Sequence, residues 1–181
     1  MNLTGVVAMT ADGCIGRNNQ IPWHHKEDFK YFRKLTLDST IIMGRKTWDS
    51  LPKKPLDKRR NVVITRQTPV RPELPERMMI PYVAPFSESD VYFTDLEHLS
   101  GILKALKEPH YVIGGAQIFE ALWPYINNFY ATMVNDVVVD GDTFISKKFF
   151  TEFKLINSVE LSPACNACKY VREGWTNAPR H

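Results

Sequence analysis

The feature that most constrains the fold is an alternation between short apolar runs and longer segments of helical periodicity. Short, mostly apolar runs typical of buried strands occupy residues 6–9, 40–43, 61–65, 91–93 and 111–113. Helical segments are predicted after Trp23 and over residues 96–107 and 117–123. This alternation predicts an α/β fold with a mostly parallel central sheet of about eight strands and helices on both faces. Residues 129–139 and 154–175 are rich in β-formers and predict a closing antiparallel pair with an antiparallel C-terminal strand.

The length of 181 residues and a hydrophobic content of 44% predict one domain spanning residues 1–181. Residues 69–90 are proline-rich and lack clear periodicity, so we expect an irregular insertion there rather than a second domain. The net charge of +3 suits an anionic small ligand, and no basic run is interleaved with aromatic residues as a nucleic-acid groove requires. The chain shows no secretion signal or membrane-spanning run, so we expect a cytoplasmic protein with no nucleic-acid or membrane partner.

The three cysteines, Cys14, Cys165 and Cys168, fit neither a disulfide framework nor a four-cysteine zinc site. His25 and Glu27, taken with the Cys-x-x-Cys pair, faintly resemble the H-x-E and P-C-x-x-C elements of zinc nucleobase deaminases. An extra alanine interrupts the second element and the two halves lie near opposite ends of the chain, so no metal is predicted. We expect Cys165 and Cys168 to lie in the loop of a terminal hairpin.

A single carboxylate, Asp28, lies on the apolar face of the helix predicted after Trp23. At about 100° per residue this face also carries Phe29, Phe32, Leu35 and Thr36, and the opposite face carries Lys26, Lys30, Arg33 and Lys34. A desolvated carboxylate needs a partner, and burial raises its pKa toward the range of proton chemistry. With aromatic rings beside it that suit a flat heterocycle, Asp28 is a candidate ligand-binding or acid/base group. The alternative is that Asp28 is an early-turn acid that favours the helix dipole.

Two predicted strand-to-helix junctions share a glycine, at residues 43–47 and 113–117. In a parallel sheet both junctions open at the edge where ligands bind. Backbone N–H groups at helix N-termini bind anions, and glycine lets a pyrophosphate approach the backbone closely. With Arg45, Lys46 and Arg66 at neighbouring strand ends, the junctions favour a nucleotide phosphate ligand. Neither junction has the G-x-G-x-x-G pattern of a Rossmann fold, and a tight turn is the alternative for each.

Short motifs that span nearly the whole chain occur in a fixed order: Ala8, Ile15-Gly16, Ile21-Pro22-Trp23, Asp28 with Phe29 and Phe32, Ile42-Met43-Gly44-Arg45-Lys46-Thr47-Trp48, Arg59, Ile113-Gly114-Gly115-Ala116, and residues 130–132. In order and spacing the chain resembles the dihydrofolate reductase family. The resemblance implies an NADPH-dependent reduction of 7,8-dihydrofolate to 5,6,7,8-tetrahydrofolate, which supports one-carbon metabolism and thymidylate synthesis. Hydride would pass to pterin C6 and a proton to N5. A monomer that binds dihydrofolate and antifolate inhibitors is also implied.

Four residues take catalytic roles by this resemblance. Asp28 would bind the amino-pyrimidine edge of the pterin through charge-assisted hydrogen bonds, and Thr132 would hydrogen bond to Asp28. The proton for N5 would come from a water near Trp23, with Asp28 setting the local electrostatics. Ile21 would belong to a mobile loop that closes over the nicotinamide.

Substrate contacts are implied for a wider set. Phe32 and Leu51 would pack against the pterin and benzoyl rings, and Arg59 would clamp the glutamate carboxylate. Without the resemblance, Arg59 reads as a solvated charge in a basic run. The implied substrate-binding residues are Val6, Asp28, Phe29, Phe32, Leu51, Arg59, Ile113 and Thr132.

Cofactor contacts are implied at both glycine junctions. Arg45, Thr65 and Arg66 resemble positions that meet the adenosine 2′-phosphate, which predicts NADPH rather than NADH. Thr47 would reach the phosphate bridge, and Gly114-Gly115 resembles a pair that the family holds in a cis peptide. The implied cofactor-binding residues are Ala8, Ile15, Gly16, Gln20, Gly44, Arg45, Lys46, Thr47, Thr65, Arg66, Ile113, Gly114, Gly115, Ala116, Gln117, Ile118 and Phe119.

Two positions depart from the family pattern, because Phe119 replaces a tyrosine that many relatives carry near the nicotinamide and Gln117 replaces a basic residue of some relatives. Three alternatives stay open. One is the pyrimidine reductase of riboflavin synthesis, against which Asp28 and the aromatic pocket argue. Another is a nucleotide-binding protein without turnover, and the third is a zinc deaminase.

Overall fold

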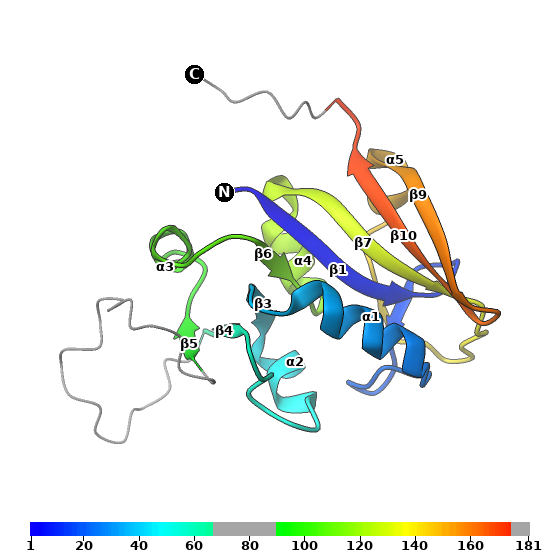
Figure 1. Cartoon of the computed structure of the whole chain (residues 1–181), viewed down its shortest axis with the longest axis horizontal. Helices are drawn as coiled ribbons and strands as arrows, with labels where there is room; N and C mark the ends of the chain where they lie inside the picture. The colour runs from blue at the N-terminus through cyan, green and yellow to red at the C-terminus, as the bar shows by residue number, and fades with distance from the viewer. Residues whose placement is uncertain (67–89, 175–181) are drawn as a thin grey trace.

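The computed structural model of this chain describes residues 1–66 and 90–174. An eight-stranded sheet forms its centre (Figure 1), in the order β5 (Val91–Thr94), β4 (Arg60–Ile64), β3 (Thr40–Gly44), β6 (His110–Val112), β1 (Leu3–Met9), β7 (Ile126–Val134), β10 (Cys165–Arg172) and β9 (Phe153–Ser162). Strand β10 is antiparallel to both of its neighbours, and the other strand pairs of this sheet are parallel. The prediction of a mostly parallel sheet with an antiparallel C-terminal strand is confirmed.

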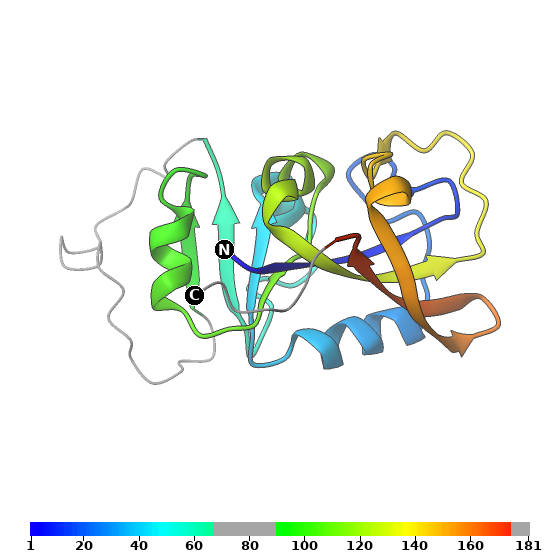
Figure 2. The ribbon, with the colours of Figure 1, turned by 90° about the horizontal axis from the view of Figure 1, so that it is seen from above.

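Helices cover both faces of the sheet. Figure 2 shows α1 (Lys26–Thr36) on one side, and α4 (Ala116–Leu122) and α5 (Phe149–Glu152) on the other. Two more helices, α2 (Arg45–Ser50) and α3 (Leu99–Ala105), complete the two layers. Strands β3 and β4 are buried along their whole length, as expected of central strands covered on both faces. The predicted arrangement of helices on both faces is therefore confirmed.

The described residues form three clusters of buried apolar side chains, and the two larger ones lie on opposite faces of the sheet. The α4 side is built around Phe129, whose ring lies 5.0–5.8 Å from the rings of Phe119, Trp123, Phe149 and Phe153. The α1 side is built on Val6, Ile41, Met43, Val63 and Tyr111. Among the described residues, no helix is long and apolar enough to cross a membrane.

The cysteine placement and several element boundaries differ from the predictions. Helix α3 ends at Ala105 rather than at residue 107, α4 spans Ala116–Leu122 rather than 117–123, and β7 begins at Ile126 rather than at residue 129. Cys165 and Cys168 are buried in β10, whereas the hairpin turn lies at Pro163 and Ala164, because proline has no N–H to donate to the ladder. Helix α3 begins at Leu99 rather than at residue 96. Asp95 folds the preceding residues into a turn by accepting the backbone N–H of His98 at 2.8 Å.

Four short elements were not predicted, one of which is the 3₁₀ helix η2 (Trp123–Tyr125). Strands β2 (Cys14–Gly16) and β8 (Thr143–Phe144) form a second, two-stranded sheet, and α5 spans four residues. Elements of this length carry too few residues to show a period. The predicted insertion at 69–90 lies outside the described residues except at Asp90.

Candidate active site

The first turn of α1 carries Asp28 into the interior. The residue is 7% exposed, and the side chain of Thr132, in β7, hydrogen bonds to its carboxylate. Burial raises the pKa of Asp28, while the hydrogen bond from Thr132 and the positive charge of His25 oppose that rise. The lysines and arginine predicted for the opposite face of α1 are exposed. The structure therefore brings together the carboxylate and the hydroxyl that the sequence analysis paired.

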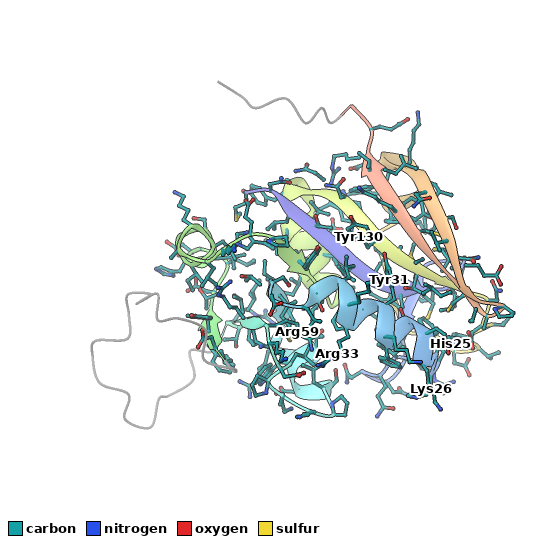
Figure 3. The ribbon with its side chains drawn as sticks, in the orientation of Figure 1. His25, Lys26, Tyr31, Arg33, Arg59 and Tyr130 are labelled. Atoms are coloured by element: carbon teal, nitrogen blue, oxygen red, sulfur yellow. The ribbon has the colours of Figure 1, made fainter. Side chains whose placement is uncertain are left out.

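His25 ties the start of α1 to the loop that follows β7. Its Nε2 lies 2.5 Å from Oδ2 of Asp136 (Figure 3 labels His25). The neighbouring Asn135 donates its backbone N–H to Ala164 O and its side-chain amide to Pro163 O, both at 2.9 Å. The surroundings of Asp28 thus depend on a loop that is itself fixed to the β9–β10 turn. Asp136 is not recognisable as a site residue from the sequence, because its contact with His25 spans 111 residues.

Trp23 has a buried polar atom without a partner. Its side chain packs in a cluster with Val134 and Ala8, and its Nε1–H makes no hydrogen bond within the part of the chain that the structure describes. Ala8 lies directly opposite Thr132 in the β1–β7 ladder. Buried N–H groups are normally satisfied, so an orphan beside these strands indicates a place for a bound water or ligand atom.

Ile21 lies at the end of a tight hairpin that precedes Trp23. Arg17 and Gln20 exchange backbone hydrogen bonds of 2.9 and 3.0 Å, and the backbone N–H of Asn18 donates to Asp142 Oδ2 at 2.7 Å. The side chain of Ile21 is exposed. The hairpin is thus held by Asp142, which directly precedes β8, and an exposed apolar side chain lies at its end.

The residues predicted to pack against the substrate rings gather on the α1 side of the sheet. Phe32, Leu51 and Ile113 are partly buried and pack against the core cluster that contains Val6. Partly buried apolar side chains at the edge of a core provide open surface for a flat ligand. Phe29 is more exposed, at 40%, and its ring lies 5.1 Å from that of His24. Phe29 is therefore more exposed to solvent than Phe32, Leu51 and Ile113.

Arg59 is buried and hydrogen-bonded, so its interpretation as a solvated charge is wrong. Its Nε donates to the main-chain oxygen of Asp57 at 3.0 Å, and Nη1 donates to Oγ1 of Thr36 at 3.0 Å. The guanidinium carbon lies 5.7 Å from the centre of the Phe32 ring. A basic run in the sequence gives no sign of this burial, because it results from how the segment before β4 folds beneath α1.

The two glycine junctions contact each other directly. The backbone N–H of Gly44 donates to Gly114 O at 2.8 Å, and the Gly114–Gly115 peptide is cis. A Cβ placed on Gly115 would lie 3.5 Å from Oγ1 of Thr47. The N-termini of α2 and α4 therefore meet at one edge of the sheet, as predicted from the glycines.

Cations and polar groups surround this edge. A pocket of about 390 Å³ brings Gln20 and Lys46 together, and its lining is completed by Asn18, Asn19, Asp49 and Ser50. Arg45 pairs with Asp49 at 3.0 Å and lies 5.9 Å from the ring centre of Phe93.

The remaining cofactor candidates divide into two groups. Thr65 donates its backbone N–H to Thr94 O at 2.8 Å, and Arg66 is exposed after the end of β4. Phe119, by contrast, is 1% exposed and packs inside the α4-side core. Its ring faces Gly114, since a Cβ placed there would lie 3.3 Å from Cε2 of Phe119. Phe119 thus supports the second junction from within.

The described residues offer no ligand set for the zinc of the deaminase alternative. Within residues 1–66 and 90–174, no group of three or more His, Cys, Asp or Glu side chains could hold a metal ion. His25, which that reading needs, pairs with Asp136 instead.

Comparisons with known proteins agree on one family. The family model for dihydrofolate reductase matches residues 2–175. A dihydrofolate reductase of Neisseria meningitidis serogroup B is 34% identical over 170 residues, which is 94% of this chain and 94% of the relative. One of Neisseria gonorrhoeae is 39% identical over 144 residues, covering 80% of this chain and 78% of the relative. Among solved structures, a dihydrofolate reductase from Enterococcus faecalis in complex with NADP(H) and RAB-propyl has a TM-score of 0.73 and 23% identity, covering 95% of this chain and 96% of that one.

Proposed function

Because the chain belongs to the dihydrofolate reductase family, it catalyses the NADPH-dependent reduction of 7,8-dihydrofolate to tetrahydrofolate, and we propose that Asp28 binds the pterin for this reaction. The observation that carries the proposal is the burial of this carboxylate with the Thr132 hydroxyl beside it. A carboxylate can accept several hydrogen bonds, and Thr132 supplies one of them. The pterin's amino group and adjacent ring N–H are a matched pair of donors for the acceptor positions that remain.

The proton for pterin N5 passes through the region of Trp23. Its unpartnered Nε1–H can donate to a water, which orients that water's lone pairs and protons in a space closed to bulk solvent. The negative charge of Asp28 favours the added positive charge on the bound ring. Trp23 and Asp28 thus act through positioning and electrostatics.

The residues at the glycine junctions fit NADPH, which supplies the hydride when bound. Gly115 leaves the backbone open to close approach, and the Thr47 hydroxyl borders the same space. Lys46 lines the adjoining pocket with a positive charge. Arg45 and Arg66 follow the carboxyl ends of β3 and β4 and suit the adenosine 2′-phosphate, in support of NADPH over NADH.

The remaining substrate contacts are assigned to side chains on the α1 side of the sheet and at the hairpin that precedes Trp23. Phe32 and Leu51 provide apolar surface for the pterin and benzoyl rings, and Arg59 receives the glutamate carboxylate. Ile21, exposed at the end of its hairpin, covers the nicotinamide when the loop closes and keeps water from the reacting atoms.

We further propose that the protein forms a single domain, acts as a monomer in the cytoplasm and binds antifolate inhibitors at the same site. The family match over residues 2–175 supports one domain. The relative from Enterococcus faecalis, whose structure contains NADP(H) and RAB-propyl, supports small-molecule ligands of both kinds.

The test is to mix the purified protein with NADPH and dihydrofolate and to follow the fall in near-ultraviolet absorbance. Two charge-assisted hydrogen bonds contribute about 3–6 kcal/mol together, so Asp28→Asn should lower kcat/KM by about 10²–10⁴-fold. Glu173→Gln, which removes an exposed ion pair with Lys154, is the control and should retain activity. Full activity in Asp28→Asn would contradict the role of Asp28. No turnover despite NADPH binding would exclude this substrate and direct the assay to the riboflavin intermediate.

A further inference from the structure

Asp57, in the segment before β4, lies between two arginines that come from different parts of the chain. Arg33 of α1 donates from Nη1 to Oδ1 at 2.9 Å and from Nη2 to Oδ2 at 3.0 Å. Arg59 donates from Nε to the main-chain oxygen of Asp57 and from Nη2 to its Oδ1 at 3.4 Å. Figure 3 shows Arg33 and Arg59 close together near the C-terminal half of α1. One carboxylate therefore joins two guanidinium groups.

The three side chains differ in their exposure to water. The side chain of Arg59 is 2% exposed, whereas those of Arg33 and Asp57 are 50% and 42% exposed. A buried guanidinium is costly unless it is paired, and burial lowers the pKa of Arg59 while Asp57 opposes that change. The effect of Asp57 on Arg59 is thus the important one, since exposed pairs contribute little by themselves.

The charges and donors of this cluster are not balanced internally. Two arginines and one carboxylate leave one positive charge unmatched. Arg59 has five N–H groups, and the described residues accept one hydrogen bond from each of its three nitrogens. The two remaining N–H groups belong to the terminal nitrogens and suit a further carboxylate.

We propose that Asp57 is a positioning residue for Arg59, which it orients so that the free N–H groups receive a carboxylate of the substrate's glutamate. Arg33 fixes Asp57 in turn through its two parallel hydrogen bonds. The inference rests on the role proposed above for Arg59. It adds Asp57 and Arg33 to the residues that determine whether a substrate with a glutamate tail is preferred.

The ionised form of Asp57 is present at neutral pH. The hydrogen bonds from Arg33 hold its pKa at about 2, below its usual range. The orienting contact is therefore formed throughout the pH range in which the enzyme would be assayed, and a neutral variant tests it directly.

The experiment compares dihydrofolate with 7,8-dihydropteroate, which lacks the glutamate. Asp57→Asn should raise KM for dihydrofolate about tenfold, leave kcat unchanged and leave both constants for dihydropteroate unchanged, because loosening a clamp weakens the contact with the tail alone. Asp57→Glu, which keeps the charge, should restore most of the affinity. Glu173→Gln removes another exposed ion pair and should resemble the wild type with both substrates.

Arg59→Leu separates this inference from the proposal on which it rests. If Arg59→Leu raises KM for dihydrofolate alone and Asp57→Asn does not, Arg59 is the clamp and the role of Asp57 is overturned. If Asp57→Asn raises KM for both substrates equally, its effect is a general structural one and the inference fails. If Arg59→Leu does not discriminate between the substrates, the clamp itself is refuted while dihydrofolate turnover still tests the overall reaction.

Discussion

Gly44→Ala should weaken both the fold and cofactor binding, because Gly44 is packed against the second glycine junction. A Cβ at this position would lie 2.8 Å from Cγ1 of Ile118, where ordinary contacts are 3.4–4 Å. Cγ1 is close to the backbone of α4, so rotation of the side-chain tip cannot relieve the clash. The first turn of α4 would have to move away from β3, and the hydrogen bond from Gly44 to Gly114 would lengthen.

The expected magnitude follows from overpacking, which costs about 1–3 kcal/mol. We expect the free energy of unfolding to fall by that amount in urea titrations followed by circular dichroism. We also expect the Kd for NADPH, measured by quenching of tryptophan fluorescence, to rise about tenfold. The reason is that the first turn of α4 remains partly displaced from β3 in the folded variant. Binding of dihydrofolate to the cofactor-free protein should be unchanged.

A double mutant tests the steric reasoning. Ile118→Ala removes Cγ1, so in Gly44→Ala/Ile118→Ala the new methyl group no longer meets it. The double mutant should be more stable than the sum of the single effects predicts, by about 1–2 kcal/mol. If the two destabilisations simply add, the contact is not the cause and the reasoning is refuted.

Three further predictions concern the core and Asp28. Phe129→Ala should lower the free energy of unfolding by about 3–5 kcal/mol in urea titrations, because it empties the centre of the aromatic core; a loss below about 1 kcal/mol would contradict this. Burial raises the pKa of Asp28 above its unfolded value, so its contribution to stability is present at low pH and lost as pH rises through the folded pKa. Asp28→Asn should therefore gain Tm relative to the wild type as pH rises from about 4 to 7, and a pH-independent difference would argue otherwise. His25→Gln should raise the pKa of Asp28 further in a carbon-13 NMR titration, since it removes an opposing positive charge; an unchanged titration would exclude that influence.

The sequence predicts the features of the fold that depend on residues close to each other along the chain. The strand predicted at 40–43 follows from a local apolar run and the inward position of Asp28 from a local helical period, and both are present in the structure. The partner of Asp28 could not be deduced in this way, because Thr132 lies on a strand 104 residues later and was named through the family resemblance. Arg59 shows the same limit, since its burial beneath α1 depends on a turn that no periodic pattern describes.

Site residues that were missed are those whose role is to support another residue. Asp57 and Asp136 are single acids in loops, and each acquires its partner only when α1 is placed on the sheet. Nothing in their sequence neighbourhood distinguishes them from solvated surface charges. The central strands β3 and β4, by contrast, were predictable, because both read as nearly continuous apolar runs.

The position of β7 between β1 and β10 has a consequence for how a newly made chain becomes active. Val6 in β1 is in register with Tyr130 in β7, and β10 pairs along β7 from Cys165 to Val171. Strand pairings between segments this distant in sequence form slowly, because a long loop must close before they can be made. The pterin site joins Asp28 of α1 to Thr132 of β7, so a folding chain gains no stabilisation from its substrate until β7 has paired with β1.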